Sequence, residues 1–476
     1  MRIEKIVLIE PKAANFHIYS KIKIIRLALP SLAAILKEIG CEVKIYAEEI
    51  SPINWFEVKE ADLVGISSTT STINESFKIA KIIKTWQKPI VIGGPHVTFE
   101  PESALTACCD FVIRGEGEET IKELIVSLRE NKPLTNIRGL SYKNEKNQII
   151  HNPDRLLIPN LDSLPDPDFS SFPNKEKLKI IPISTSRGCP FNCEFCTVTT
   201  LFGRKYRVRS IDRVINEIKN LNPQPKRLFI VDDNFTANKE RSKELLRRMI
   251  EEKINIPWST QVRVDVAEDE ELLSLMSKAG CYWVYIGFES INPKSLAEAN
   301  KKQRVEDYQK VTQKFNKYGI NVHGMFVFGF DEDEPTLFQK TVRFASKIKL
   351  ASVQFLILTP IPGSRLYKKF KEKARIFTKQ WSFYDGHHVV FNPLRISAYT
   401  LQQETIKAMK KFYSIPRTIK LFLTSWPSKN LWKQIFFRFA GYLLIKKWLK
   451  NKTNKLYLNF LSKRQKKGKE IFEGTL

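Results

Sequence analysis

Three of the seven cysteines lie within eight residues near the middle of this 476-residue chain, in the segment RGCPFNCEFC at residues 187–196. Cys189, Cys193 and Cys196 have the spacing C-x3-C-x2-C, and no fourth cysteine or histidine is nearby. A structural zinc site normally has four ligands, and a thiol redox pair needs only two cysteines. Three thiolates on one short loop suit three irons of a [4Fe–4S] cluster, whose fourth iron stays open to a non-protein ligand. A zinc site completed by one distant ligand is the alternative.

Short apolar runs rich in Val and Ile indicate the elements that surround this loop. Five of them lie in the first ~130 residues and alternate with helical patterns such as residues 30–40 and 74–84. Strand–helix alternation implies parallel strands with right-handed crossovers, so this part predicts an α/β doubly wound, Rossmann-like sheet. The five expected strands are KIVLIE, EVKIYA, DLVGIS, PIVIGG and DFVIRG, at residues 5–10, 42–47, 62–67, 89–94 and 110–115.

The same alternation continues in the middle of the chain, where helical patterns separate six further apolar runs. Six successive β/α units predict a barrel or partial barrel, whose active face lies at the carboxyl ends of the strands. The cysteine loop follows the first of these strands and therefore opens onto that face. The six expected strands lie at residues 179–186, 226–233, 257–266, 282–290, 323–330 and 352–360.

These patterns divide the chain into four parts. We expect a doubly wound domain at 1–135, a linker at 136–178 that includes NLDSLPDPDFSSFPNKEK, a (β/α)6 partial barrel at 179–365, and a basic, mainly helical extension at 366–476. The hydrophobic content of 42% excludes a disordered or collagen-like chain. The N-terminal MRIEKIVLIE reads as a strand rather than a signal peptide, which predicts a cytoplasmic protein.

The cysteine spacing, with the aromatic Phe195 before the third cysteine, resembles the signature of the radical S-adenosylmethionine (SAM) superfamily. The resemblance implies that SAM chelates the open iron through its amino and carboxylate groups. It also implies that reduction of the cluster cleaves SAM to methionine and a 5′-deoxyadenosyl radical, which abstracts hydrogen from an unactivated carbon. A low-potential electron donor such as ferredoxin or flavodoxin is implied as a partner.

Other segments match this superfamily in chain order and suggest residues that contact SAM. The resemblance implies that Asp232 or Asp233, in FIVDDNF, meets the SAM ammonium, and that Arg263 pairs with the SAM carboxylate. Glu289, in GFES, resembles an acid that binds SAM polar atoms, and LTPIPGS at 358–364 ends the strand near the adenine. The alternatives are helix N-capping for the two aspartates and a barrel salt bridge for Arg263 and Glu289.

A doubly wound domain before such a barrel resembles the cobalamin-binding class of the superfamily. The matching segments are GISSTTST, with Ser67 and Thr69, and GGPHVTFEP, with Gly93 and Gly94; DFVIRGEGEETI also recurs in that class. Small residues at these strand ends let a large flat cofactor approach the backbone. The D-x-H-x-x-G motif is missing around His17, so cobalamin is expected without a histidine lower ligand, and some such proteins bind none. We expect His96 to shape a loop.

The segment WSFYDGHHVVFNP, at 381–393, resembles the region beyond the barrel in hopanoid-modifying enzymes and in the anaerobic magnesium-protoporphyrin ester cyclase group. The resemblance implies that four of its side chains line a substrate cavity, with an ordered surface loop as the alternative. These side chains are Trp381, Tyr384, His387 and His388.

The C-terminal part is strongly basic. Of the chain's net charge of +27, residues 401–476 contribute 18 Lys/Arg against three Asp/Glu. Residues 431–450 are aromatic and apolar, but Arg438 inside them and lysines at their end make a poor membrane-spanning helix. Such a segment can lie in the interface of an anionic membrane. Packing on its own domain and contact with RNA are the alternatives.

Together these features predict a radical SAM enzyme that uses cobalamin to methylate carbon in a lipophilic isoprenoid, lipid or tetrapyrrole. Radical ring formation or C–C joining on such a substrate is the alternative reaction. Two other classes are a non-catalytic cobalamin or membrane sensor and a tRNA methylthiotransferase. The latter needs a second cysteine cluster, and the N-terminal part has only Cys41, Cys108 and Cys109, so nucleic acid is not expected as a partner. We expect a cytoplasmic enzyme that contacts the inner face of the cell membrane peripherally.

Overall fold

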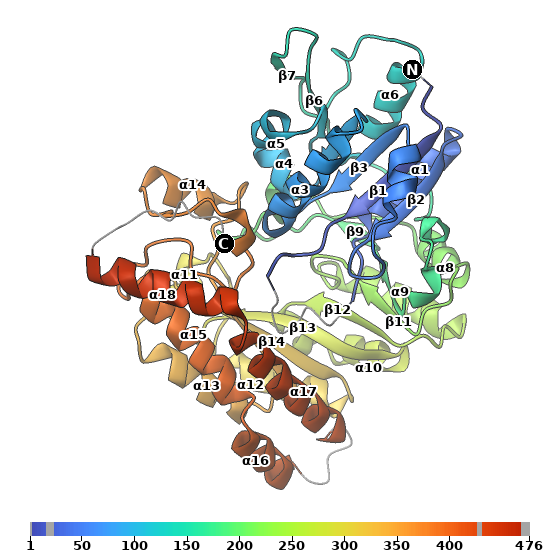
Figure 1. Cartoon of the computed structure of the whole chain (residues 1–476). Coiled ribbons are helices and arrows are strands. Elements are labelled where there is room, and N and C mark those ends of the chain that lie inside the picture. The colour runs from blue at the N-terminus through green and yellow to red at the C-terminus, as the bar shows by residue number, and fades with distance from the viewer. Residues whose placement is uncertain (1, 16–22, 426–430, 468–476) are drawn as a thin grey trace. The chain divides into compact units, whose positions relative to one another are not determined.

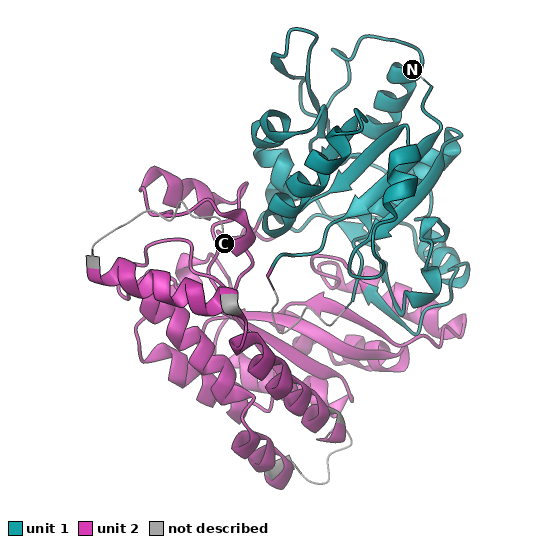
Figure 2. Cartoon of the chain, viewed as in Figure 1, with its two compact units in different colours: residues 1–14, 23–190, 197–229 teal, residues 15–22, 191–196, 230–476 magenta. Residues whose placement is uncertain are grey.

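The computed structural model describes residues 2–15, 23–425 and 431–467. His17 therefore lies outside the described residues. The chain forms two compact units, coloured separately in Figure 2. The first contains residues 1–14, 23–190 and 197–229, and the second contains residues 15–22, 191–196 and 230–476.

The first unit contains a seven-stranded sheet with the order β2-β1-β3-β4-β5-β6-β7 (Figure 1). Its first five strands are parallel, and the order reverses direction at β1, which confirms the predicted doubly wound sheet. These strands are β1 (Lys5–Glu10), β2 (Glu42–Ala47), β3 (Leu63–Ser67), β4 (Ile90–Gly93) and β5 (Phe111–Ile113). The helices between them are α1 (Ala28–Glu38), α2 (Trp55–Glu60), α3 (Ile73–Lys84), α4 (Pro95–Phe99), α5 (Pro101–Ala107) and α6 (Glu118–Arg129).

Part of the segment expected to be a linker is instead a β-hairpin. Strands β6 (Leu140–Lys143) and β7 (Ile149–His151) are antiparallel, and β6 adds to the sheet beside β5. Asn144 shapes the turn, because its side-chain oxygen accepts hydrogen bonds from the amides of Lys146 and Gln148. The expectation of a linker throughout 136–178 was therefore wrong for these residues. The remainder of the segment holds three short 3-10 turns at Leu161–Ser163, Phe169–Ser171 and Lys175–Lys177.

A second sheet has six strands in the order β15-β14-β13-β12-β11-β8. Each of these six strands neighbours the next of the six along the chain. The pairs from β12 to β15 are parallel, as the predicted (β/α)6 partial barrel requires. The strands are β8 (Ile180–Ile183), β11 (Arg227–Ile230), β12 (Trp258–Val262), β13 (Cys281–Glu289), β14 (Asn321–Phe328) and β15 (Ser352–Ile357). The helices are α7 (Val198–Leu201), α8 (Ile211–Lys219), α9 (Lys239–Glu251), α10 (Glu270–Lys278), α11 (Pro293–Glu298), α12 (Asp307–Lys317), α13 (Leu337–Lys347) and α14 (Arg365–Glu372).

Four helices form the C-terminal extension: α15 (Ala398–Phe412), α16 (Ile415–Ser425), α17 (Leu431–Leu449) and α18 (Lys452–Lys467). Helix α15 contacts β15, α13 and α18. The hydroxyl of Tyr413, just after α15, accepts a hydrogen bond from the amide of Val353 in β15 and donates one to its carbonyl. The extension is therefore built onto the last strand of the barrel wall.

Helix α17 corresponds to the aromatic segment expected in a membrane interface, and one of its faces packs on the protein instead. Arg438 is 1% exposed, and its guanidinium donates to the carbonyls of Phe412 and Leu350 and stacks on the Phe412 ring. The buried side chains on this face also include Leu431, Ile445 and Trp448. Packing on its own domain, the alternative considered for this segment, is thus correct for this face.

The opposite face of α17 is exposed and also apolar. Its exposed large side chains recur at helical spacing, which places them on one stripe of the helix: Trp432, Phe436, Phe439 and Leu443. Within the described ranges, no helix is both long enough and apolar enough to cross a membrane.

Candidate active site

Residues Phe191–Cys196 of the cysteine loop are held within the second unit by hydrogen bonds to their backbone carbonyls. The carbonyl of Asn192 accepts from Asn300 at 2.7 Å and from Arg365 at 2.6 Å. The carbonyl of Glu194 accepts from the amide of Leu366 at 3.0 Å. These partners come from the residues after α11 and from the start of α14, so two connections that follow barrel strands hold this part of the loop.

Two aromatic residues of the loop contact the residues that follow barrel strands. The guanidinium of Arg263, just beyond β12, lies 3.7 Å from the centre of the Phe191 ring. The ring of Phe195 meets that of Phe330, just beyond β14, edge to face at 6.5 Å. Phe195 also lines a small pocket with Glu194, Glu298, Phe330, Leu358, Leu366 and Lys369. This half of the loop therefore lies at the carboxyl ends of the strands, as predicted.

The three cysteines are half-buried thiols in the structure. Cys189 belongs to the first unit, and Cys193 and Cys196 belong to the second. Among the residues that the structure describes, no three His, Cys, Asp or Glu side chains are gathered as a metal-ligand group. The donor set, three thiols on one loop, nevertheless has the chemistry that an iron–sulfur cluster needs. Gly188 helps the chain to turn here, because it has φ +89° and a Cβ atom would lie 2.5 Å from the carbonyl of Lys205.

Glu289 ends β13 in an unusual backbone conformation. It has φ +60°, and the register with β14 shifts between Gly287 and Glu289, which marks a bulge. Strained residues of this kind cluster at ligand sites. Its carboxylate is buried and pairs with Lys301 at 2.8 Å, so a barrel salt bridge, the alternative for Glu289, is formed. Lys301 could not be predicted as the partner of Glu289, because nothing in the KKQR segment, residues 301–304, indicates which acid this lysine meets.

Asp232 and Asp233 follow β11, and both are shielded from solvent. Asp232 is 1% exposed. Burial, and next the neighbouring Asp232, raise the pKa of Asp233 to about 7. Helix α9 is capped by Asn238, whose side chain accepts from the amide of Arg241, so the capping alternative for these aspartates is wrong. Two adjacent carboxylates, one buried and one half-buried, would stabilise a cation bound beside them.

Arg263 is 8% exposed and has only part of its hydrogen-bonding capacity used. One terminal nitrogen donates to the carbonyl of Lys302 at 3.2 Å. Its Nε atom lies 3.9 Å from Asp265 and has no hydrogen-bond partner in the described part of the chain. A buried guanidinium in this state can accept a carboxylate ligand without breaking a strong existing pair.

In the first unit, the residues expected near cobalamin lie at the ends of β3 and β4. The amide of Ser68 donates to the carbonyl of Gly93 at 2.9 Å, which joins the two strand ends. Gly94 has φ +115°, and a Cβ atom there would lie 2.3 Å from the Ser68 carbonyl, so only glycine fits. Ser67 ends β3, and Thr69 begins the 3-10 turn Thr70–Thr72 with a capping box. The site thus has the small residues that close approach of a cofactor requires.

His96 lies beside these strand ends and is fully buried. Burial lowers its pKa to about 4, and its Nδ1 atom is 3.3 Å from the Thr70 hydroxyl. This contact joins α4 to the turn after β3, which agrees with the prediction that His96 shapes a loop.

The segment 381–393 is not a surface loop, because the four side chains singled out in it are buried: Trp381, Tyr384, His387 and His388. The ring nitrogens of His388 lie 2.9 Å from Asp385 and 3.1 Å from Asn454 in α18. The pKa of Asp385 is lowered to about 2: its burial opposes this direction, and the adjacent His388 outweighs it. These residues join the extension to its last helix, and a role in a substrate cavity stays a prediction.

Comparison with known families agrees with this geometry. A model of the radical SAM superfamily matches residues 183–345, and a model of the B12 binding domain matches residues 20–125. The chain is 35% identical over 370 residues to the uncharacterized methyltransferase PH0819 of Pyrococcus horikoshii, covering 76% of this chain and 80% of that protein. The chain belongs to the B12-binding radical SAM family. The protein is therefore an enzyme, and its cofactors are a [4Fe–4S] cluster, SAM and cobalamin.

Other relatives extend the comparison. The bacteriochlorophyllide d C-12(1)-methyltransferase of Chlorobaculum tepidum is 30% identical to this chain, over 74% of this chain and 75% of its own length. Among solved structures, OxsB matches with a TM-score of 0.69 and 15% identity over 97% of this chain and 75% of its own. TsrM from Kitasatospora setae matches with a TM-score of 0.66 and 19% identity over 78% of this chain and 75% of its own. At these identities, the two structures support the fold alone.

Proposed function

We propose that the chain is a cobalamin-dependent radical SAM enzyme that methylates a carbon of a lipophilic small molecule: an isoprenoid, a lipid or a tetrapyrrole. The observation that carries the proposal is the similarity, over about three quarters of the chain, to two proteins named as methyltransferases. One of them acts on a bacteriochlorophyllide, and we therefore place tetrapyrroles first among the substrates.

In this proposal, each site residue binds or orients a cofactor. Cys189, Cys193 and Cys196 would hold the cluster, and the chemistry that it would supply when reduced is the one electron that cleaves SAM to methionine and a 5′-deoxyadenosyl radical. Arg263 pairs with the SAM carboxylate, since its guanidinium is buried and only partly engaged. Asp232 and Asp233 receive the SAM ammonium, Glu289 binds SAM polar atoms, and Phe195 packs beside the cofactor.

The strand ends of the first unit hold cobalamin in this proposal. Ser67, Thr69, Gly93 and Gly94 form the surface that approaches the flat cofactor, and no histidine ligates its lower face. His96 supports this assignment, because its ring is fully buried and its Nδ1 atom already meets Thr70. The domain boundaries in this proposal lie at residues 135, 178 and 365, and the segment between the first two contains the β6–β7 hairpin.

Anaerobic turnover tests the reaction. The reconstituted full chain would receive SAM with a deuterated methyl group, a reductant such as reduced flavodoxin or ferredoxin, and in separate assays a bacteriochlorophyllide, an isoprenoid or a membrane lipid. We expect a product that carries one deuterated methyl group, together with 5′-deoxyadenosine. Absence of label from every product, while 5′-deoxyadenosine is formed, would contradict methylation.

Ring formation is the second candidate reaction. It is supported by similarity to the anaerobic magnesium-protoporphyrin IX monomethyl ester cyclase of Rubrivivax gelatinosus, which is 27% identical over 66% of this chain and 60% of its own length. In the turnover assay, this reaction would give an unlabelled product that has lost hydrogen.

We further propose that the exposed stripe of α17 docks the enzyme on an anionic membrane. The stripe supplies apolar area, and Lys446, Lys447 and Lys450 lie exposed at the same end of the extension. Each lysine near an anionic surface adds about 1 kcal/mol, a contribution that salt screens. Docking here would bring the enzyme close to lipophilic substrates.

Liposome flotation tests this contact. Because the other face of α17 is packed, we replace exposed residues rather than truncate the chain. The variant Phe436→Ser/Phe439→Ser should lose flotation with anionic vesicles at low salt, whereas Leu156→Ser, at another exposed leucine, should float like the parent chain. Equal flotation of both variants, or a parent chain that ignores anionic vesicles, would contradict membrane docking.

A further inference from the structure

Two arginines face each other at the base of the cysteine loop. The short strands β9 (Ser186–Arg187) and β10 (Arg207–Val208) pair antiparallel, and Arg187 lies directly opposite Arg207. Their side chains are 18% and 3% exposed. Like charges directly opposite each other destabilise a strand pair, so this ladder needs an anion. The two strands enclose residues 188–206, which contain all three cysteines of the loop.

Glu116 is that anion. Its Oε1 atom accepts from Arg187 at 2.9 Å and from Arg207 at 3.0 Å. Its Oε2 atom accepts from Arg207 at 2.9 Å and from the amide of Ile158 at 2.7 Å. The side chain is 2% exposed, and its four hydrogen bonds occupy the acceptor positions of the carboxylate. The pair with Arg207 is bidentate, a geometry that fixes orientation as well as distance.

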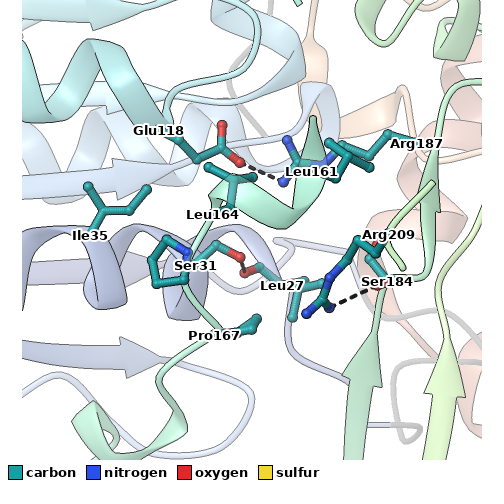
Figure 3. A pocket seen from close by; sticks show the side chains of 11 residues that line it. Leu27, Ser31, Ile35, Glu118, Leu161, Leu164, Pro167, Ser184, Arg187 and Arg209 are labelled. Atoms are coloured by element: carbon teal, nitrogen blue, oxygen red, sulfur yellow. Dashed lines mark hydrogen bonds and ion pairs between the residues drawn. The ribbon is translucent and has the colours of Figure 1, made fainter. Parts of the chain in front are cut away.

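A second acid and two carbonyls complete the network. Glu118 accepts from Arg187 at 2.6 Å, and Figure 3 shows this pair at the edge of a pocket lined also by leucines and prolines. Arg207 also donates to the carbonyls of Ile158 at 2.6 Å and Phe202 at 3.1 Å. Phe202 lies inside the enclosed segment, so the network holds one of its internal turns as well as its two ends.

The network joins distant parts of the sequence within the first unit. Glu116 and Glu118 belong to the range matched by the B12 binding domain, and Arg187 and Arg207 belong to the range matched by the radical SAM superfamily. A buried ion network is weak evidence for stability, because desolvation of the charges offsets their attraction. The network instead holds the two short strands and the residues around Glu116 in a single geometry.

We propose that Glu116, assisted by Glu118, is a positioning residue for the cysteine loop. It fixes the base of the loop through Arg187 and Arg207, so that Cys189 and residues 197–206, which belong to the same unit, take a single geometry. The proposal rests on the proposed ligation of the cluster by these cysteines. It assigns a role to Glu116 and Glu118 of the GEGEE sequence, residues 115–119, through their contacts with Arg187 and Arg207.

Hydrogen–deuterium exchange of the cluster-free full chain tests the proposal directly. In Glu116→Gln, residues 188–190 and 197–206 should exchange at least about tenfold faster, because two facing arginines lose their common partner. Glu119→Gln is the matched control, since Glu119 is an exposed acid three residues away, in the first turn of α6. Iron bound after reconstitution should fall in Glu116→Gln and not in the control. Unchanged exchange in 188–190 and 197–206, or acceleration spread evenly over the first sheet, would overturn the proposal.

Two further variants keep the test decisive if Glu116→Gln folds poorly. Glu118→Gln removes only one contact of Arg187 and should speed exchange in the same segment to a smaller degree. Glu116→Gln/Arg187→Gln also removes one of the two facing charges and should recover part of the lost protection. Parent-like exchange in Glu118→Gln, or no recovery in the double variant, would overturn the proposal. If even the parent chain bound no iron, the cofactor assignment would be wrong, whereas the exchange result would still decide the role of Glu116.

Discussion

At the scale of single residues, the three cysteines make the most direct prediction. Anaerobically purified chain should bind about four irons, and Cys189→Ala, Cys193→Ala and Cys196→Ala should each lose most of them, because each thiolate holds one iron. Iron analysis and EPR of the reduced protein measure this. Cys108→Ala is the control, since Cys108 is also half-buried but lies in the first sheet region. A triple alanine variant that kept its cluster signal would refute the ligation.

Asp233 makes a prediction about pH. Burial, and next the neighbouring Asp232, raise its pKa from 3.8 to about 7, so between these two pH values the folded chain keeps this carboxyl protonated whereas the unfolded chain has ionised it. Its contribution to stability is therefore lost as the pH rises through about 7. The SAM ammonium favours the ionised form, so SAM affinity should rise with pH up to about 7 and then level off.

The measurement is SAM binding between about pH 6 and pH 8, where one linked proton gives a change of up to about tenfold per pH unit. Asp233→Asn should bind SAM more weakly and lose this dependence. Glu268→Gln, at an exposed acid, should keep the profile of the parent chain. An unchanged profile in Asp233→Asn would remove Asp233 from the SAM site.

At the scale of elements, α17 makes a prediction about stability. Arg438 is buried, burial lowers its pKa to about 10, and its guanidinium donates to the carbonyls of Phe412 and Leu350. Arg438→Met keeps the apolar stem but orphans the carbonyls of Leu350 and Phe412, which should cost about 2–4 kcal/mol of unfolding free energy. Urea unfolding measures the loss. Lys450→Met, at the exposed end of the helix, should cost little, and equal stability of both variants would contradict the packing role.

The sequence predicted elements well where local pattern decides them. All eleven expected strands are present, because buried parallel strands appear as apolar runs whatever their partners. The hairpin β6–β7 was missed because its strands are short and surrounded by Lys and Asn. The packed face of α17 could not be predicted for a different reason: the helix is apolar on two opposite faces, so no single stripe distinguished packing from exposure.

The site was predictable only in part, for a similar reason. The cysteines, Asp233, Arg263 and Glu289 follow strands, so barrel topology places them at one edge. The pair of Glu289 with Lys301 depends on a bulge and a positive φ that no local pattern reveals. The contact of Glu116 with Arg207 joins residues 91 positions apart. Only the tertiary structure brings such groups together.

At the scale of the whole molecule, the testable prediction concerns how cobalamin binding changes the stability of the chain. The apo chain should be stabilised by added cobalamin, by about 2.7 kcal/mol when the ligand is at a hundred times its Kd. Thermal unfolding at increasing cobalamin concentration measures the shift. EPR of the cobalt should show no nitrogen coupling from a protein imidazole. Such a coupling would contradict the open lower face. If cobalamin did not shift the unfolding temperature and the chain retained none of it, a reaction without cobalamin would be favoured.

The facing arginines of β9 and β10 have a consequence for the order in which the chain acquires its parts. Their ladder is unfavourable until Glu116 lies between them, and Glu116 precedes α6 in the first sheet region. During synthesis the N-terminal residues emerge first and fold as a unit. We therefore expect the doubly wound sheet to act as the template on which the cysteine loop takes shape, so that iron enters late, into a chain that has already folded its first half.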